Sequence, residues 1–178
     1  MTRIGLPETP MDNDQATTST KPAVERIHPP DWLIRLVNPL MRRLVRRGRG
    51  RLADRVAVLE FTGRRTGRAY AVPVGYRVVD GRGTVLTSSR WRHNFAGGAD
   101  VTLARGGRRR RVHAELMDDP AAVAALYDRL IGENGWRKAG RELGLRINVD
   151  RRPTLDELED AVRRSGLSVI WIDGPHHD

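Results

Sequence analysis

Short apolar segments separated by tight, glycine-containing turns make up the middle of the chain and most constrain its fold. Runs with the composition of β-strands occupy residues 56–62, 71–79, 84–88, 100–104 and 110–117. The dipeptides Asp80-Gly81 and Gly106-Gly107 lie between consecutive runs, and such dipeptides are typical of β-hairpins. Strands that follow one another through tight turns tend to pair antiparallel, so this region predicts a small barrel or a curled sheet.

Two different segments precede these strands. Residues 1–28 are polar, contain several prolines and lack apolar periodicity, so they predict a disordered tail. Residues 31–48 predict an amphipathic helix, because apolar side chains recur there as adjacent pairs at every fourth position. The favoured interpretation is that this apolar stripe packs on the domain core. Because the rest of the helix is rich in arginine, contact with an anionic membrane surface is the alternative.

The C-terminal third favours helices. Asp119 is a good N-cap that is followed by proline, and Thr154 with Glu157 has the spacing of a capping box. Helices are predicted over residues 121–131, 136–143 and 154–166, and residues 168–172 have the composition of a last strand. The sequence therefore predicts an α+β fold, in which one domain spans residues 29–174, with a helical insert over about 119–165 and a short tail over 175–178.

Composition restricts the classes of function. The formal net charge is +10, which suits nucleic acid, an anionic membrane or a phosphorylated ligand. Of the 32 basic residues only Lys21 and Lys138 are lysine, a bias typical of GC-rich genomes, so part of the charge reflects the genome. Aromatic residues make up 5%, which is a poor supply for stacking single-stranded bases.

Other functions are restricted by residues that the sequence lacks. The chain has no cysteine, which excludes disulfides, thiolate metal sites and a cysteine nucleophile. The histidines do not have the spacing of a metal site. No apolar run has the length of a membrane span, and the N-terminus does not resemble a signal peptide. We therefore expect a cytoplasmic protein, with peripheral contact to the inner face of the membrane as the alternative.

An arginine-rich turn joins the first two predicted strands. Residues 63–68 read Gly-Arg-Arg-Thr-Gly-Arg. The glycines allow backbone N–H groups to approach a ligand closely, and the guanidinium groups can bind phosphate or carboxylate with two parallel hydrogen bonds. The residues alone leave two interpretations equally open: an anion-binding site and a solvated hairpin tip.

A second unusual segment follows the third predicted strand. Residues 87–95 contain Ser88 and Ser89 and then the run Trp-Arg-His-Asn-Phe. A planar ring could stack against Trp91 and be oriented by Asn94 or by backbone amides of the serines. The alternative interpretation places Trp91 and Phe95 in the core and makes Asn94 the cap of the next turn.

Together these segments resemble a known family. The order of TGRRTG, VPVGY, the Asp-Gly hairpin, WRHNF and DVTLARGGR is similar to that of the deazaflavin (coenzyme F420)-dependent nitroreductase and quinone reductase family, over about residues 32–118. The resemblance implies a split β-barrel of the FMN-binding type. It also implies coenzyme F420 as the cofactor, with FMN as the alternative, and a homodimer.

The resemblance also implies which residues bind the coenzyme. The arginine-rich turn matches the motif that grips the phosphate and the anionic tail, the strand after it passes beside the deazaflavin ring, and the segment around Trp91 packs on the coenzyme and bonds to it. The matched residues are Arg64, Arg65, Thr66, Val72, Pro73, Val74, Ser88, Ser89, Trp91 and Asn94.

Two departures from the family pattern lie within the matched segments. Tyr70 stands where relatives often carry arginine, and only Arg90 lies between Ser89 and Trp91, where relatives have a longer, positively charged loop. We expect Arg90 to keep the positive charge of that loop and to contact the coenzyme.

The implied reaction is hydride transfer from the reduced deazaflavin to a quinone, a nitro compound or another electrophilic acceptor. Ser89, Tyr76 or water could supply the proton. Tyr127 and Trp136 are candidate walls of a substrate pocket by residue type alone. Two other functions stay open: a flavin, deazaflavin or lipid-like ligand carrier without turnover, and a nucleic-acid or membrane-surface binder that uses residues 105–111 and the arginine-rich helix.

Overall fold

The computed structural model describes residues 21–27 and 55–174. The helix predicted over residues 31–48, its contact with a membrane and the tail over 175–178 lie outside the described residues. Within the described part, no helix combines the length and the apolar character that crossing a membrane requires.

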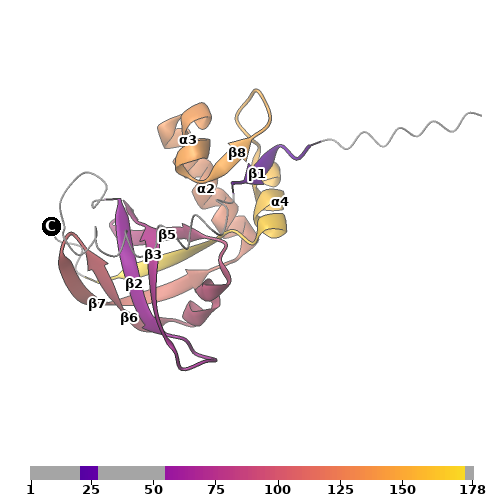
Figure 1. Cartoon of the computed structure of the whole chain (residues 1–178). Coiled ribbons are helices and arrows are strands. Elements are labelled where there is room, and N and C mark those ends of the chain that lie inside the picture. Colours follow the sequence, from indigo (N-terminus) through magenta and orange to yellow (C-terminus); the bar gives the residue numbers. More distant parts are fainter. Residues whose placement is uncertain (1–20, 28–54, 175–178) are drawn as a thin grey trace, which may run out of the picture.

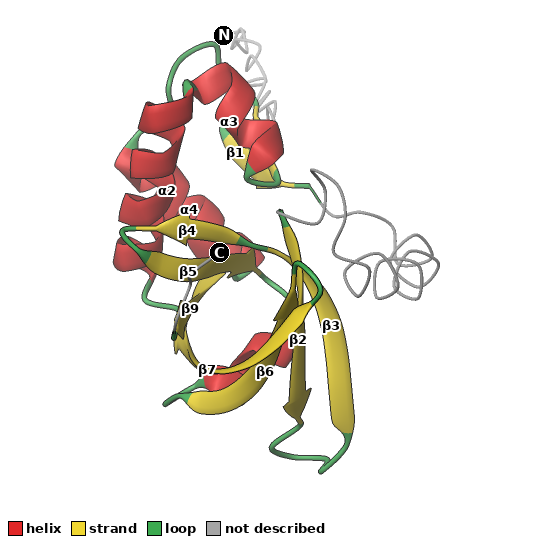
Figure 2. Cartoon of the chain, turned by 90° about the vertical axis from the view of Figure 1, so that its left-hand side faces the viewer, coloured by secondary structure: helices red, strands yellow, loops and turns green. Residues whose placement is uncertain are grey.

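A curled antiparallel sheet forms the larger part of the molecule. Its strands have the order β3-β2-β6-β7-β9-β5-β4, and β3 also approaches β5, so that the sheet closes most of a barrel (Figure 2). The α+β split-barrel prediction is therefore confirmed. The strands are β2 (Val56–Thr62), β3 (Ala69–Gly75), β4 (Arg77–Val79), β5 (Arg82–Thr87), β6 (Ala99–Arg105), β7 (Arg108–Met117) and β9 (Ser168–Asp173).

Residue alternation explains how the sheet is buried. In β7, Val112 and Ala114 are buried whereas His113 and Glu115 are exposed, as expected of a strand with one face toward a core. Strand β9 is buried on both faces. Its Ile170 packs in the barrel interior, and its neighbour Val169 packs against the helices, so this strand is the wall that the two apolar cores share.

A helical cap covers one end of the barrel (Figure 1). We use this name for three helices and the two-stranded sheet beside them: α2 (Pro120–Asn134), α3 (Trp136–Glu142), α4 (Leu155–Ser165), β1 (Val24–Arg26) and β8 (Leu145–Ile147). The three predicted helices are confirmed, with ends that differ by a few residues from the predicted ones.

Predicted capping residues begin two of these helices. The Asp119 side chain accepts a hydrogen bond from the Ala122 N–H at 2.8 Å at the start of α2. At the start of α4, the Thr154 hydroxyl accepts from the Glu157 N–H at 3.3 Å, and the Glu157 carboxylate accepts from the Thr154 N–H at 2.9 Å. Both caps satisfy backbone donors that have no partner inside the helix.

Two details differ from the sequence prediction. Residues 24–26 fall in the segment that we expected to be disordered, yet they form β1, which pairs with β8 inside the predicted helical insert. Each of these strands has three residues, which is too short to show an alternating pattern. The single strand predicted over 71–79 is divided at Tyr76 into β3 and β4, because β3 pairs with β2 whereas β4 pairs with β5.

Candidate functional site

The arginine turn, which we define as residues 63–68, closes the hairpin between β2 and β3. The Gly63 N–H donates to the Arg68 carbonyl at 2.8 Å, and the Gly67 N–H donates to the Gly63 carbonyl at 2.8 Å. Gly67 has a backbone φ of 63°, which residues other than glycine rarely adopt. A Cβ at Gly63 would lie 2.6 Å from the Tyr70 ring. Both glycines are therefore required by the geometry of the turn.

The structure brings the arginine turn and the segment around Trp91 together. That segment forms the short 3₁₀ helix η1 (Arg90–Phe95). The Asn94 Oδ1 atom accepts from the Arg64 N–H at 2.9 Å, and its Nδ2 donates to the Trp91 carbonyl at 2.7 Å. The Arg64 guanidinium also donates to the Ala96 carbonyl. Asn94 thus ties two segments that lie 30 residues apart in the sequence.

Four aromatic rings support this junction. Phe61 stacks with Tyr70 at a centroid distance of 5.4 Å, and it contacts Phe95 edge-on at 5.0 Å. Trp91 lies 5.8 Å from Phe95 and 6.1 Å from Phe61. Phe95 is completely buried, which agrees with its alternative assignment to the core, whereas Trp91 is half-buried at the margin of the barrel core. The indole is therefore packed from one side and partly accessible.

The remaining arginines of this region face solvent. Arg65, Arg68 and Arg90 are exposed, and no described residue bonds to their guanidinium groups. The Thr66 hydroxyl, by contrast, lies 3.3 Å from the Tyr70 hydroxyl and accepts from the Arg68 N–H at 3.3 Å. The Thr66 hydroxyl is therefore engaged by Tyr70, which is one of the departures from the family pattern.

The two serines lie at the start of η1. Ser89 is the N-cap residue, is exposed, and makes no capping hydrogen bond with its side chain. Arg92 holds this turn, because its Nη1 donates to the carbonyls of Ser88 at 2.7 Å and of Ser89 at 3.3 Å. Sequence reasoning missed Arg92. The only signal available was its position four residues after a serine, which is too common to single it out.

The other predicted proton donor, Tyr76, has a different environment. It is 6% exposed in the barrel interior, and a Cβ at Gly83 would lie 2.4 Å from its hydroxyl. Burial raises the pKa of Tyr76, while the guanidinium of Arg105, 4.9 Å above its ring, lowers it. Ser89 and Tyr76 thus differ in access to solvent.

The strand that we predicted to pass beside the deazaflavin ring is β3, which lies at an edge of the sheet. Val72 and Pro73 are half-buried and Val74 is buried. Proline is tolerated at sheet edges because an edge strand bonds on one side only.

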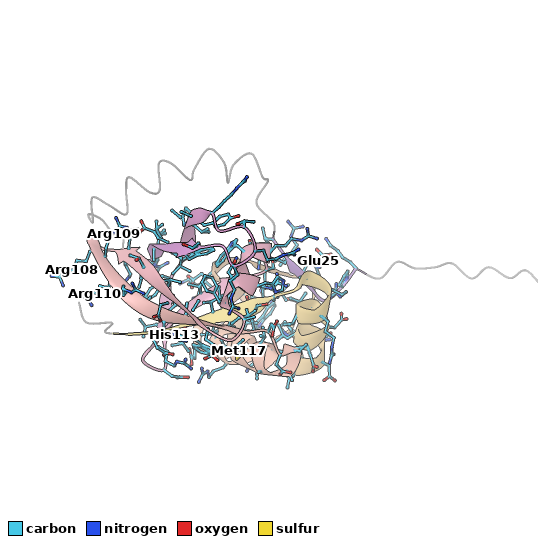
Figure 3. All side chains as sticks on the ribbon, turned by 90° about the horizontal axis from the view of Figure 1, so that it is seen from below. Glu25, Arg108, Arg109, Arg110, His113 and Met117 are labelled. Atoms are coloured by element: carbon cyan, nitrogen blue, oxygen red, sulfur yellow. The ribbon has the colours of Figure 1, made fainter. Side chains whose placement is uncertain are left out.

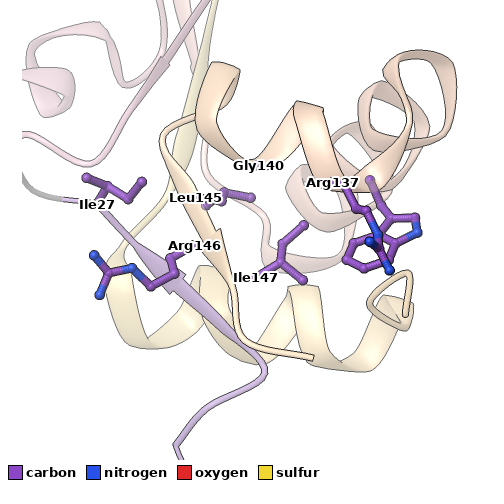
Figure 4. Close-up of a pocket in the computed structure, with 7 residues that line it drawn as sticks. Ile27, Arg137, Gly140, Leu145, Arg146 and Ile147 are labelled. Carbon is purple, nitrogen blue, oxygen red and sulfur yellow. The ribbon is translucent and has the colours of Figure 1, made fainter. Parts of the chain in front are cut away.

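A separate pocket lies in the helical cap (Figure 4). Its volume is about 360 Å³, and it is far from the arginine turn, which lies at the opposite end of the molecule. Trp136 lines it, whereas Tyr127 does not, so only one of the two candidate pocket walls lies at this pocket. Its lining residues are Ile27, Trp136, Arg137, Gly140, Leu145, Arg146 and Ile147.

The curled sheet, the arginine turn and the helix η1 together define a split β-barrel protein with an exposed cationic tip beside an accessible aromatic ring. A family model described as F420H2-dependent quinone reductase matches residues 33–141. The chain therefore belongs to this family, and coenzyme F420 is the cofactor that the family uses.

Two further comparisons do not extend the family assignment. A solved structure described as a domain-swapped dimer is 14% identical and superposes with a TM-score of 0.41, covering 80% of this chain and 98% of that chain. The comparison with curated proteins found no match.

The residues at the arginine turn fit this coenzyme, which combines a flat ring with an anionic tail. The exposed guanidinium groups of Arg65 and Arg68 are suitable donors to the tail. The half-buried indole of Trp91 is a suitable surface for the ring. Asn94 already uses one donor and one acceptor within the protein, and its amide has capacity for a further hydrogen bond of each kind.

Proposed function

We propose that the chain binds reduced coenzyme F420 between the arginine turn and η1 and transfers its hydride to a quinone, a nitro compound or another electrophilic acceptor. The observation that supports this most strongly is the hydrogen bond between the Arg64 N–H and Asn94. It holds a group of exposed cations next to an accessible indole, and this pairing suits one ligand that is anionic at one end and planar at the other.

The arginines of the turn have different roles in this proposal. Arg65 and Arg68 bind the anionic part of the coenzyme, because their guanidinium groups are exposed and not held by described residues. Arg90 adds a third positive charge from η1. Arg64 acts as a positioning residue instead, since its N–H and its guanidinium bond to Asn94 and Ala96.

The ring lies between η1 and β3 in this proposal. Trp91 packs against it, Asn94 bonds to it, and Val72, which packs against the same core cluster as Trp91, forms the wall at the sheet edge. Pro73 lies on the opposite face of β3. The reduced coenzyme supplies the hydride, and the protein binds, orients and excludes water. Of the two side chains considered as proton donors, we favour Ser89 because it is exposed, whereas Tyr76 is buried in the barrel.

The decisive experiment compares Arg65→Ala with Arg108→Ala. Both residues are exposed arginines, but Arg108 lies at the far tip of the β6–β7 hairpin (Figure 3). Loss of a hydrogen bond to a charged group costs about 1.5–3 kcal/mol, so Arg65→Ala should weaken coenzyme binding by about 10-fold to 150-fold. Arg108→Ala should leave it unchanged. Titration of each variant with the coenzyme, followed by tryptophan fluorescence, measures the two affinities. Equal losses of affinity in the two variants would contradict the proposal.

Turnover separates the enzyme from a carrier. We expect the purified chain to oxidise the reduced coenzyme when a quinone or a nitro compound is added. Saturable binding without such oxidation would favour the carrier function on the same barrel.

One observation favours examining nucleic acid as well. Arg108, Arg109 and Arg110 project together from one end of β7 (Figure 3). Arg109 is already paired with Glu60, which reduces the charge available to a polyanion. We expect only weak binding to unrelated DNA, with a steep dependence on salt.

The assembly that we propose is a homodimer, as the family resemblance implies. Sedimentation equilibrium should give a mass of twice the 20.0 kDa of one chain. A mass equal to that of one chain would contradict this.

A further inference from the structure

A buried tyrosine hydroxyl has no hydrogen-bond partner. Tyr127, on α2, is 1% exposed, and its hydroxyl is among the few buried side-chain atoms of the described residues that bond to nothing. Burial raises its pKa to about 12, while the nearby Arg26 and Arg77 lower it. The hydroxyl is therefore protonated at neutral pH and is available as a donor. Buried hydroxyls without partners are uncommon in folded proteins and call for an explanation.

Two half-buried arginines each have a similar unpaired atom. The Nε atoms of Arg26, on β1, and of Arg92, on η1, are buried and have no hydrogen-bond partner among the described residues. Burial lowers the pKa of Arg26, and the positive charge of Arg92 lowers it further, whereas Tyr127 raises it. Arg26 lies two residues after Val24 and therefore on the same face of β1, and Val24 packs in the apolar core that holds Tyr127.

A third arginine reaches this cluster from β4. Burial lowers the pKa of Arg77, as does Arg55, whereas Tyr127 and Glu142 raise it. The Arg77 Nη2 atom donates to the backbone carbonyl of Glu142 at 3.2 Å. Glu142 is exposed, and its carboxylate is the acidic group that raises the pKa of Arg77.

Arg92 is also held at a fixed position. Its Nη1 bonds to the Ser88 carbonyl at 2.7 Å, and a Cβ at Gly166 would lie 3.0 Å from its Nη2. Gly166 ends α4 in the left-handed conformation, with a φ of 61°. The absence of a side chain there leaves room for the guanidinium at the junction of barrel and cap.

We propose that Arg26, Arg77, Arg92 and Tyr127 form a binding site for a phosphate-type oxyanion. The three positive groups and the hydroxyl come from β1, β4, η1 and α2, and an anion would satisfy the Tyr127 hydroxyl and the Nε atoms of Arg26 and Arg92, which the described residues leave without an acceptor. A tetrahedral anion suits this arrangement, because it offers acceptor oxygens in several directions at once.

This site is distinct from the proposed coenzyme site. Trp91 and Arg92 are consecutive residues of η1, but Trp91 packs on Phe61 and Phe95, whereas Arg92 reaches the serine carbonyls and Gly166. The anion would thus join the helical cap to η1 through Arg92. The proposal does not depend on coenzyme binding, and its test uses the protein without coenzyme.

Inorganic phosphate is the probe. We expect phosphate to raise the melting temperature of the full chain in a concentration-dependent manner, beyond the effect of sodium chloride at equal ionic strength, because a ligand that binds only the folded state stabilises it. Sodium glutamate, in a parallel series, tests whether a carboxylate serves as well. A smaller effect of glutamate is expected for a site that prefers a tetrahedral anion.

Variants then locate the binding. Arg26→Gln should weaken phosphate binding by about 10-fold or more, since it removes a charged donor, and should raise the melting temperature without phosphate, since it relieves repulsion. Tyr127→Phe should weaken phosphate binding to a smaller extent while keeping the ring in the core. Arg108→Gln, at the start of β7, and Arg146→Gln, on β8, are matched controls that should keep the wild-type response.

Three results would overturn the site. One is an equal response of the wild-type chain to phosphate and to chloride. Another is loss of the phosphate response in Arg108→Gln but not in Tyr127→Phe. The third is an equal destabilisation of Arg26→Gln with and without phosphate, which would mean that a protein group already holds this arginine. Tyr127→Phe keeps the test decisive if Arg26→Gln does not fold.

Discussion

The arginine turn with η1 and the helical cap are stabilised in different ways. In the first region, hydrogen bonds from Arg64 to Asn94 and to Ala96 join segments about 30 residues apart, over a cluster of aromatic rings. In the helical cap, the ends of two helices are held by local contacts, the caps at Asp119 and Thr154. Changes in the first region should therefore alter coenzyme binding and stability together, whereas changes at these helix caps should alter stability without altering coenzyme binding.

The largest effect is expected from a pair of core truncations, Phe95→Ala and Leu158→Ala. Phe95 is fully buried beneath Trp91, and Leu158 is 2% exposed on α4. Truncation costs about 3–5 kcal/mol for a buried phenylalanine and about 2–5 kcal/mol for a buried leucine, as urea denaturation would measure. Only Phe95→Ala should also weaken coenzyme binding. A similar loss of affinity in Leu158→Ala would break the distinction between the two regions.

The second largest effect is expected at Asn94, which joins the arginine turn to η1. Asn94→Ala removes the acceptor of the Arg64 N–H and the donor to the Trp91 carbonyl, and should lower the free energy of unfolding by about 1–2 kcal/mol. Coenzyme affinity should fall as well, because the turn and η1 are no longer held together. Asn94→Asp sharpens the test: it keeps an acceptor for Arg64 but adds a negative charge, so it should lose affinity with less loss of stability. Retention of full affinity by both variants would contradict the role of Asn94.

A comparable loss of stability in the helical cap should leave binding intact. Thr154→Ala removes the hydroxyl that accepts from the Glu157 N–H at the start of α4, and caps of this kind contribute about 1 kcal/mol. Urea denaturation measures the stability, and coenzyme titration at a temperature where the variant is folded measures the binding. Weaker coenzyme binding in this variant would show that the cap and the candidate site are coupled.

The same contrast explains what the sequence could predict. The cap at Asp119, the capping box at Thr154 and the alternation in β7 are local patterns, and the structure confirms each of them. The hydrogen bond of Arg64 to Asn94 is not local, so the residues alone left the arginine turn and the Trp91 segment as separate hypotheses, and only the family resemblance connected them. The roles of these residues toward the coenzyme stay a prediction.

Two features of the junction between barrel and cap could not be predicted at all. Strand β1 has three residues and no alternation, and its pairing with β8 depends on the packing of the helical cap. Arg26, Arg77, Arg92 and Tyr127 come from four different elements, so no spacing in the sequence could indicate the anion site that we propose for them.

The smallest effect is a dependence on pH in the helical cap. Hydrogen bonds from the Arg151 guanidinium, followed by that from the Thr154 N–H, lower the pKa of Glu157 from 4.5 to about 2. Between these values the unfolded chain binds more protons than the folded one, so stability rises with pH and is lost as the pH falls from about 4.5 to about 2. The pair faces solvent, which screens it, so the change in melting temperature should be small. Arg151→Gln should flatten this part of the profile. The control Arg137→Gln, which breaks the exposed pair with Asp150, should keep the wild-type slope, and an unchanged slope in Arg151→Gln would contradict the assignment.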